Sequence, residues 1–219
     1  TSGSAFAFAN QLVPNLELKL QDFAPVAAVA SNPAVIVASG NFQAKTLAEL
    51  ATFANPSSIN FCSTGSGGLN HLQLEMFRSV VKGKTGKPYD VTHVPYNGLA
   101  PALTGIRDGS VQACMLAVQS KARLPWLPDV PTTGQQGYPE MDGNDSFINV
   151  AAPKGTPEAV IAKLETALQK TMQDATVRKK LDDLEVQSLF MGSRETQKWL
   201  EDEVRKFSAI IRDAGLSTK

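Results

Sequence analysis

The stretch from Ile59 to His71 constrains the fold of this chain more than any other. Its sequence, INFCSTGSGGLNH, predicts a short apolar strand, then a turn of small hydroxyl and glycine residues, then the start of a helix. The first amide N–H groups of a helix have no partner inside the helix, and the helix dipole adds partial positive charge at the same end. A glycine-rich turn that leads a strand into a helix is therefore suited to bind an anion, and we interpret this turn as a candidate carboxylate site.

The turn formed by residues 63–68 does not match the known nucleotide-binding loops. It lacks the Gly-Lys-Ser/Thr ending of a Walker A motif, and its three glycines do not have the spacing of G-x-G-x-x-G. A small anion held by backbone amides and hydroxyls, without a fixed positive side chain, is the ligand class that fits. The alternative is a tight turn with a purely structural role, because glycine-rich turns between strands and helices also serve packing.

Residues 59–115 alternate strands and helices in the pattern of an α/β fold. After the first strand and the helix that begins near Leu69, a second strand is predicted at 91–94, a second helix near Pro101 and a third strand at 111–115. This alternation predicts a parallel sheet, in which ligands bind beyond the carboxyl ends of the strands.

Two turns of this pattern are expected to face the same crevice. The turn at 63–68 follows one strand and the turn at 95–98 follows the next, where Tyr96 and Asn97 offer hydrogen-bond donors. Ordinary turn chemistry is the alternative for this second turn. His71 lies just inside the helix and could donate to a bound carboxylate, although a histidine at such a place more often packs against the adjacent turn.

The composition indicates a globular protein and argues against several partners. With 219 residues, 42% hydrophobic and 19% charged, the chain can bury a large core as one domain or as two lobes. Its 21 basic and 21 acidic residues balance, which gives no support for nucleic acid or an anionic membrane as a partner. There is no run of about 18 apolar residues. The given chain also begins without a signal peptide, as a mature chain would.

The two cysteines, Cys62 and Cys114, open a rival interpretation as an enzyme. In a cysteine-dependent hydrolase, Cys62 would be the nucleophile and His71 or His93, with Asp90, would complete a relay. However, Cys62 falls inside a predicted strand and not at an exposed elbow, and His93 lies in an apolar strand where a structural role is expected. We therefore expect a protein that is not an enzyme. The cysteines have no metal-ligand spacing, and composition leaves them as buried thiols or one disulfide.

Several segments, taken in order, resemble one protein family. INFCSTGSGG with the following His71-Leu72 resembles the family segment NYGSSG-x-GS…HL, and HVPYNGLAPAL at 93–103 resembles HVPYKG-x-x-PAL. TLAEL at 46–50, LPDVPT at 127–132 and APKGTP at 152–157 are similar to further family segments. The family is that of the Bug/TctC-type solute-binding proteins of tripartite tricarboxylate transporters, and the resemblance covers nearly the whole chain.

The resemblance implies a type II periplasmic-binding-protein (Venus flytrap) fold, with two lobes that each contain a mostly parallel sheet flanked by helices. The expected lobes are residues 1–33 with 143–219, and residues 34–142. The resemblance also implies a periplasmic monomer without cofactor or metal. Such a protein captures a di- or tricarboxylate, or an aromatic acid, between its lobes and delivers it to the membrane subunits of the transporter.

Carried over by position, the loop at 63–68 and the turn at Tyr96 would hold carboxylate oxygens, and the N-terminal Thr1-Ser2-Gly3 resembles a loop of the other lobe. The expected ligand-binding residues are Ser2, Gly3, Ser63, Thr64, Gly65, Ser66, Gly67, Gly68, His71, Tyr96 and Asn97. The family has an N-terminal Gly-Gly loop and a longer stretch after Met115 that this sequence lacks, so we expect the given chain to be incomplete. An oxidising periplasm would permit a Cys62–Cys114 disulfide if their strands are neighbours.

Overall fold

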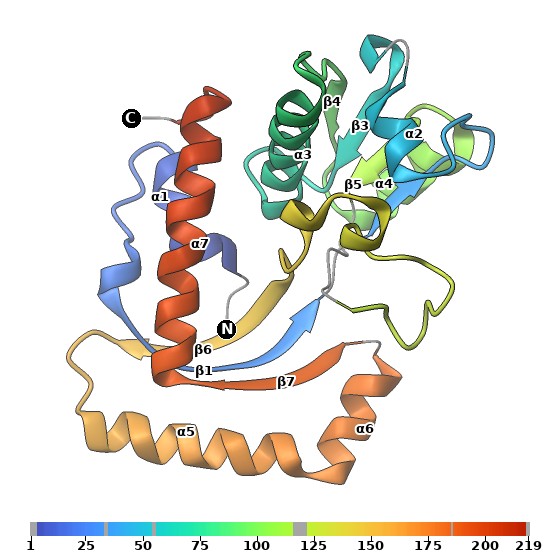
Figure 1. Ribbon diagram of the computed structural model, residues 1–219. Coiled ribbons are helices and arrows are strands. Elements are labelled where there is room, and N and C mark those ends of the chain that lie inside the picture. The colour runs from blue at the N-terminus through green and yellow to red at the C-terminus, as the bar shows by residue number, and fades with distance from the viewer. Residues whose placement is uncertain (1–3, 33–34, 54–55, 116–121, 185, 218–219) are drawn as a thin grey trace. The chain divides into compact units, whose positions relative to one another are not determined.

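The computed structural model describes residues 4–32, 35–53, 56–115, 122–184 and 186–217. The chain divides into two compact units, one made of Thr1–Asn32 and Ser146–Lys219 and the other of Pro33–Asp145. Each unit has its own sheet and its own helices (Figure 1).

Unit 2, residues 33–145, is built on a four-stranded sheet with the order β2-β5-β3-β4. The strands are β2 (Ile36–Ala38), β3 (Asn60–Ser63), β4 (Thr92–Pro95) and β5 (Ala113–Met115), and the helices are α2 (Leu47–Ala51), α3 (Leu69–Thr85) and α4 (Leu99–Asp108). Short 3-10 helices are η3 (Pro56–Ser58), η4 (Gly134–Gln136) and η5 (Pro139–Met141). Strand β3 runs parallel to both β4 and β5, and β2 runs antiparallel to β5. The predicted parallel sheet is therefore present in this unit.

The helices of unit 2 begin and end where local chemistry favours it. Thr46 caps α2, since its side chain accepts a hydrogen bond from the amide of Glu49 at 3.1 Å. Helix α3 buries an apolar stripe that includes Leu72 and Phe77, both fully buried. It ends at Gly86, whose φ of 71° is a left-handed cap conformation that favours glycine.

Unit 1 contains a three-stranded sheet with the order β6-β1-β7. The strands are β1 (Phe23–Asn32), β6 (Ser146–Pro153) and β7 (Gln187–Gly192). The helices are α1 (Ala9–Leu12), α5 (Glu158–Gln173), α6 (Ala175–Asp183) and α7 (Ser193–Asp213), with the 3-10 helices η1 (Ser4–Ala7) and η2 (Leu20–Asp22). Both β6 and β7 pair antiparallel to β1. The expectation of a mostly parallel sheet is therefore wrong for this lobe. The connection through α5 and α6 keeps β6 and β7 parallel to each other, but β1 is inserted between them in the opposite direction.

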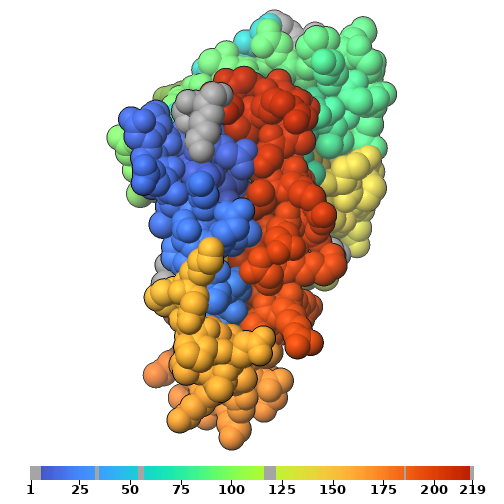
Figure 2. All heavy atoms as spheres, turned by 90° about the vertical axis from the view of Figure 1, so that its left-hand side faces the viewer, coloured from blue at the N-terminus to red at the C-terminus, as the bar shows by residue number. Residues whose placement is uncertain are grey.

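The core of unit 1 forms where the N-terminal segment packs against α7. The rings of Phe8 and Phe207 are both fully buried, with centroids 5.1 Å apart. Gln11 donates from Nε2 to the hydroxyl of Ser208 at 2.7 Å. Figure 2 shows this N-terminal segment, in blue, lying along α7, in red. Helix α7 contributes Phe207, Leu200 and Ile211 to this core, and all three are buried.

Candidate carboxylate-binding site

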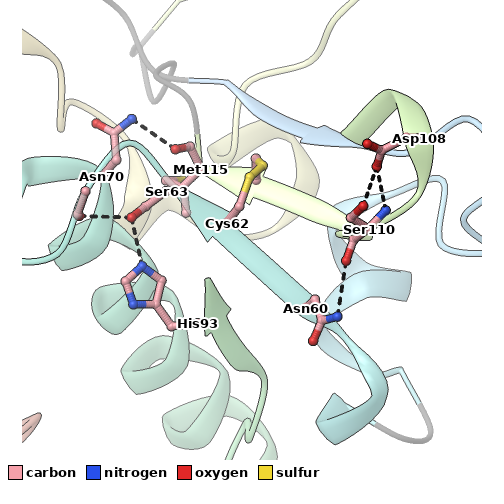
Figure 3. The surroundings of a disulfide bond; sticks show 10 residues. Asn60, Cys62, Ser63, Asn70, His93, Asp108, Ser110 and Met115 are labelled. Atoms are coloured by element: carbon pink, nitrogen blue, oxygen red, sulfur yellow. Dashed lines mark hydrogen bonds between the residues drawn. A yellow bond between two sulfur atoms is a disulfide. The ribbon is translucent and has the colours of Figure 1, made fainter. Parts of the chain in front are cut away.

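A disulfide joins the two strands at the centre of the unit 2 sheet (Figure 3). Cys62 on β3 and Cys114 on β5 are paired in register, with their Cα atoms 4.3 Å apart, and both side chains are fully buried. They pack with Ala102, Ile106 and Val111 in one hydrophobic cluster. Since the sulfur of Cys62 is bonded to Cys114 and buried, Cys62 is not a free thiolate, and the cysteine hydrolase interpretation loses its nucleophile.

The loop at 63–68 and the turn at 95–98 lie at the same edge of this sheet, because β3 and β4 run parallel and end side by side. The amide of Tyr96 donates to the carbonyl of Ser63 at 2.9 Å, which ties the two turns together. Asn70, in the first turn of α3, donates from Nδ2 to the carbonyl of Met115 at 2.9 Å and so fixes the helix start to the end of β5. The two turns that the sequence predicts at one crevice are neighbours in the structure.

Glycine gives the loop its shape and leaves the helix start open. Gly65 and Gly67 have φ values of 142° and 72°, which L side chains rarely adopt. Gly68 is the N-cap of α3, and no side chain of the described residues caps the first helical amides. The N–H groups and the positive end of the dipole are therefore not covered by a capping group, as a small-anion site requires.

The side chain of Ser63 points into the protein and not away from it. Its hydroxyl is fully buried, donates to the carbonyl of Gly65 at 3.0 Å and lies 2.8 Å from Nε2 of His93. A hydroxyl carries a single hydrogen, so Oγ accepts the second bond from the Nε2–H of His93. Ser63 thus holds the loop, while Thr64 is half-buried and Ser66 is exposed.

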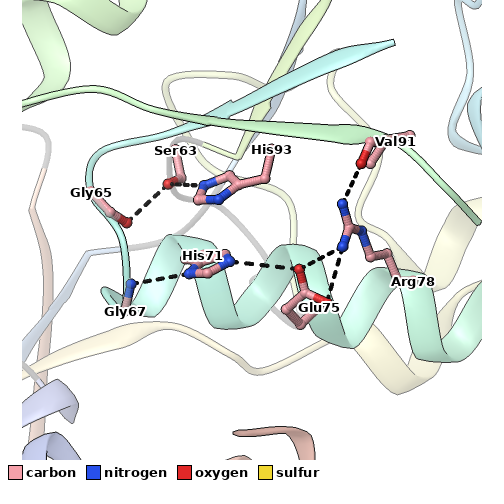
Figure 4. A network of polar contacts seen from close by, with 8 residues as sticks. All are labelled: Ser63, Gly65, Gly67, His71, Glu75, Arg78, Val91 and His93. Atoms are coloured by element: carbon pink, nitrogen blue, oxygen red, sulfur yellow. Dashed lines mark hydrogen bonds and ion pairs between the residues drawn. The ribbon is translucent and has the colours of Figure 1, made fainter. Parts of the chain in front are cut away.

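The ring of His71 is also directed at protein groups (Figure 4). Its Nδ1 accepts from the amide of Gly67 at 3.0 Å, and its Nε2 lies 3.6 Å from Oε1 of Glu75. The ring is stacked on that of His93, with centroids 3.9 Å apart and planes 9° from parallel. In this arrangement both ring nitrogens of His71 have protein partners.

A half-buried charge pair lies next to the two histidines, further along α3. Glu75 forms an ion pair with Arg78 at 3.0 Å, and Arg78 also donates to the carbonyl of Val91. Burial raises the pKa of Glu75, but the hydrogen bond from His71 and the charge of Arg78 outweigh it, so its pKa lies below the usual value. Burial and the neighbouring His71 lower the pKa of His93 to about 4, so His93 is neutral at neutral pH.

Tyr96 and Asn97 follow β4 as the sequence predicts, but their side chains differ in setting. The ring of Tyr96 packs against the disulfide cluster, and its hydroxyl occupies the space that a side chain at Gly105 would need. Asn97 is exposed. The remaining expected site residues, Ser2 and Gly3, lie outside the described part of the chain, as does the junction after Met115.

Sequence reasoning missed the roles of His93, Glu75 and Arg78. A helical signal for two of them was present, since Glu75 lies four residues after His71 and three before Arg78, the spacings at which side chains meet on a helix. The contact between His93 and the loop depends on the pairing of β3 with β4, which the sequence does not state directly.

A separate cavity of about 340 Å³ lies elsewhere in unit 2, and no residue of the loop lines it. Its walls come from β2, α2 and residues 122–136 and are mainly apolar. Its two cations have protein partners, since Lys45 donates to Gly40 and Arg123 to Gln135 and Pro128. This cavity fits a carboxylate less well than the loop does.

Among the described residues, no group of three His, Cys, Asp or Glu could hold a metal, and no helix is long and apolar enough to span a membrane.

The chain of two α/β units has the fold of a solved periplasmic binding protein, BugD. Residues 2–216 match the family described as "Tripartite tricarboxylate transporter family receptor", and the chain belongs to this TctC family.

Solved structures agree with this assignment. The periplasmic binding protein BugD is 25% identical, and the match covers 98% of this chain and 77% of BugD with a TM-score of 0.75. MatC from Rhodopseudomonas palustris, solved with bound malate, is 24% identical over 95% of this chain and 75% of MatC, with a TM-score of 0.70. Rpa4515 from R. palustris, solved with adipate, is 24% identical over 95% of this chain and 74% of the Rpa4515 chain, with a TM-score of 0.74. The fold is therefore the periplasmic-binding-protein fold, and the family and its solved relatives are binding proteins, not enzymes.

Proposed function

We propose that this chain is an extracytoplasmic solute-binding protein that captures a carboxylate and delivers it to the membrane subunits of a tripartite transporter. The family description supports the transport role. MatC was solved with malate and Rpa4515 with adipate, which are both dicarboxylates, and this supports the ligand class. A di- or tricarboxylate is the first ligand to test, and an aromatic acid is the alternative.

The observation that carries this proposal is the uncapped start of α3 at the glycine-rich loop. We propose that one carboxylate of the ligand accepts hydrogen bonds from the loop amides and from the hydroxyls of Thr64 and Ser66, with Asn97 contributing from the neighbouring turn. The helix dipole and the free amides favour an anion here without a dedicated cation. The nearby Arg78 does not serve as that cation, because it is already paired with Glu75.

We also propose that residues 1–33 with 143–219 form one lobe and residues 34–142 the other. The division of the chain into compact units at Asn32/Pro33 and Asp145/Ser146 supports boundaries within a few residues of these. As the family resemblance implies, the lobes would close on the ligand, and the protein would act as a periplasmic monomer. A decrease in the radius of gyration on ligand addition, measured by small-angle scattering, would be the expected sign of closure.

Calorimetric titration and thermal-shift measurements test the ligand class directly. We expect malate, adipate or citrate to raise the melting temperature, and the uncharged diamide of the same acid to have no effect. A ligand at 100 times its Kd adds about 2.7 kcal/mol to the free energy of unfolding. The absence of a shift with every di-, tri- and aromatic carboxylate would contradict the proposal.

The variant Ser66→Asp tests the location of the site. Ser66 is exposed in the loop, so an added carboxylate there should repel the ligand with little effect on folding. Asn41→Asp is the matched control, because Asn41 is exposed in the same unit and lies outside the loop. We expect Ser66→Asp to weaken binding at least tenfold and Asn41→Asp to leave it unchanged.

A further inference from the structure

The two histidines of the chain hold the two ends of the glycine-rich loop. His93 bonds to Ser63, where the loop begins, and His71 bonds to the amide of Gly67, near where it ends. Their rings are stacked in parallel at 3.9 Å, so the two ends of the loop are linked through one pair of imidazoles (Figure 4). This link between the two histidines is made by protein groups alone.

The hydrogen bonds assign the tautomer of each ring. Nδ1 of His71 accepts from Gly67 and so carries no hydrogen, which places the ring hydrogen on Nε2, facing Glu75. Ser63 gives its only hydrogen to Gly65, so Nε2 of His93 is the donor in the second bond. His71 is therefore neutral in the Nε2–H form, and His93 also carries a hydrogen on Nε2. The lowered pKa of His93, about 4, leaves that ring neutral as well. A proton added to Nδ1 of His71 would put two donors face to face and break the bond to Gly67.

We propose that His71 and His93 are positioning residues that keep the loop in its anion-binding shape, and that they do so only while both rings are neutral. This inference rests on the proposed carboxylate function of the loop. It gives His71 a role different from ligand contact, because His71 accepts from the Gly67 amide and so holds the loop whose other amides would meet the ligand.

The groups around His93 explain how its ring stays neutral. On α3, Glu75 favours a protonated His93 ring, whereas His71 and Arg78 disfavour one. For His93, burial is the largest influence, and together with His71 and Arg78 it outweighs Glu75. Two charged rings stacked at this distance would also repel each other, so protonation of one ring opposes protonation of the other.

Two pairs of substitutions separate the effect of losing a hydrogen bond from the effect of changing the size of the side chain. His93→Gln keeps an N–H donor near the place of Nε2, whereas His93→Phe keeps the ring and loses the donor. His71→Asn keeps an acceptor near the place of Nδ1, whereas His71→Phe loses it. We expect both Phe variants to raise the Kd for malate or adipate, whichever the wild type binds, by about tenfold, in line with the loss of one partly buried hydrogen bond. The Gln and Asn variants should stay within about threefold of the wild type.

A long-range proton–nitrogen correlation spectrum of the unliganded wild type tests the geometry without any variant. Because the chain has two histidines, the two imidazoles are readily assigned. We expect both rings in the Nε2–H form at neutral pH, and the Gly67 amide resonance to move when the pair is protonated in acid. A ring in the Nδ1–H form would overturn the proposal, and so would a Gly67 amide resonance that does not move on protonation. Phe variants that bind like the wild type would overturn it as well. A wild type that binds no carboxylate would instead refute the proposed function, while the spectrum would still report on the pair.

Discussion

Cys62 and Cys114 lie opposite each other on the parallel strands β3 and β5, and their disulfide is fully buried under residues of α4. The bond closes a loop over a sequence separation of 52 residues that contains α3, β4 and α4. A cross-link of this length removes much of the freedom of the unfolded chain. The strand end that carries the glycine-rich loop is therefore fixed covalently to its neighbour.

Replacing both cysteines with alanine should lower the stability of unit 2. For a loop of this length, chain entropy predicts a loss of about 4 kcal/mol in the free energy of unfolding. Urea unfolding followed by the fluorescence of a probe in unit 2 would measure it. The same denaturant midpoint for the double variant and the oxidised wild type would contradict this expectation.

Gly67→Ala should weaken both the loop and ligand binding. Gly67 has a φ of 72°, and a non-glycine residue in this conformation costs roughly 1–2 kcal/mol. Gly83→Ala is the control, since Gly83 lies within α3 and a Cβ there meets open space. It should raise stability by about 0.5–1 kcal/mol and leave binding unchanged. Thermal unfolding should show shifts of opposite sign for the two variants, and calorimetric titration should show weaker binding for Gly67→Ala only.

The stability of the protein should fall in acid through His93. Its pKa is about 4 in the folded protein and about 6.5 in an unfolded chain, so the unfolded chain binds more protons between these values. The contribution of His93 to stability is therefore present above about pH 6.5 and is lost as the pH falls to about 4. Unfolding midpoints measured across this range should show a smaller pH slope for His93→Gln than for the wild type. Equal slopes would rule out His93 as the source.

Asp174→Ala should destabilise the start of α6. The Asp174 carboxylate accepts from the amides of Thr176 and Val177 at 2.8 and 3.1 Å, which makes it the N-cap. Loss of such a cap costs about 1 kcal/mol. Asp182→Ala, at an exposed position within the same helix, is the control and should have a much smaller effect on the melting temperature. Equal effects of the two substitutions would argue against the cap.

The local features of the site were predictable from the sequence. The strand, turn and helix predicted around residues 59–71 correspond to β3, the loop and α3. They could be predicted because the spacing of apolar residues and the glycine content are local properties of the sequence. Helix α3 passes through Gly83, continues to Thr85 and ends at Gly86. Glycine also tolerates an ordinary helical conformation, so its presence alone does not decide which glycine caps the helix.

Features that depend on strand order were not predictable. β5 lies beside β3 although β4 comes between them in the sequence, and this order decides that the two cysteines meet. The stacking of His71 on His93 needs both the pairing of β3 with β4 and the packing of α3, so neither histidine alone indicated it. The alternation of strands and helices predicts that consecutive strands are parallel, but not which strand is inserted between them.

The insertion of β1 between β6 and β7 has a consequence for how the chain is made. β1 is synthesised early, whereas both of its partners come from the last part of the chain, beginning at Ser146. The sheet of β1 can therefore form only after nearly the whole polypeptide has been made, whereas the strands of the other sheet all lie within residues 33–145. The same long sequence separation slows the pairing of β1 when the complete chain refolds. In a pulse-labelling hydrogen-exchange experiment we therefore expect the amides of β3 to be protected before those of β1.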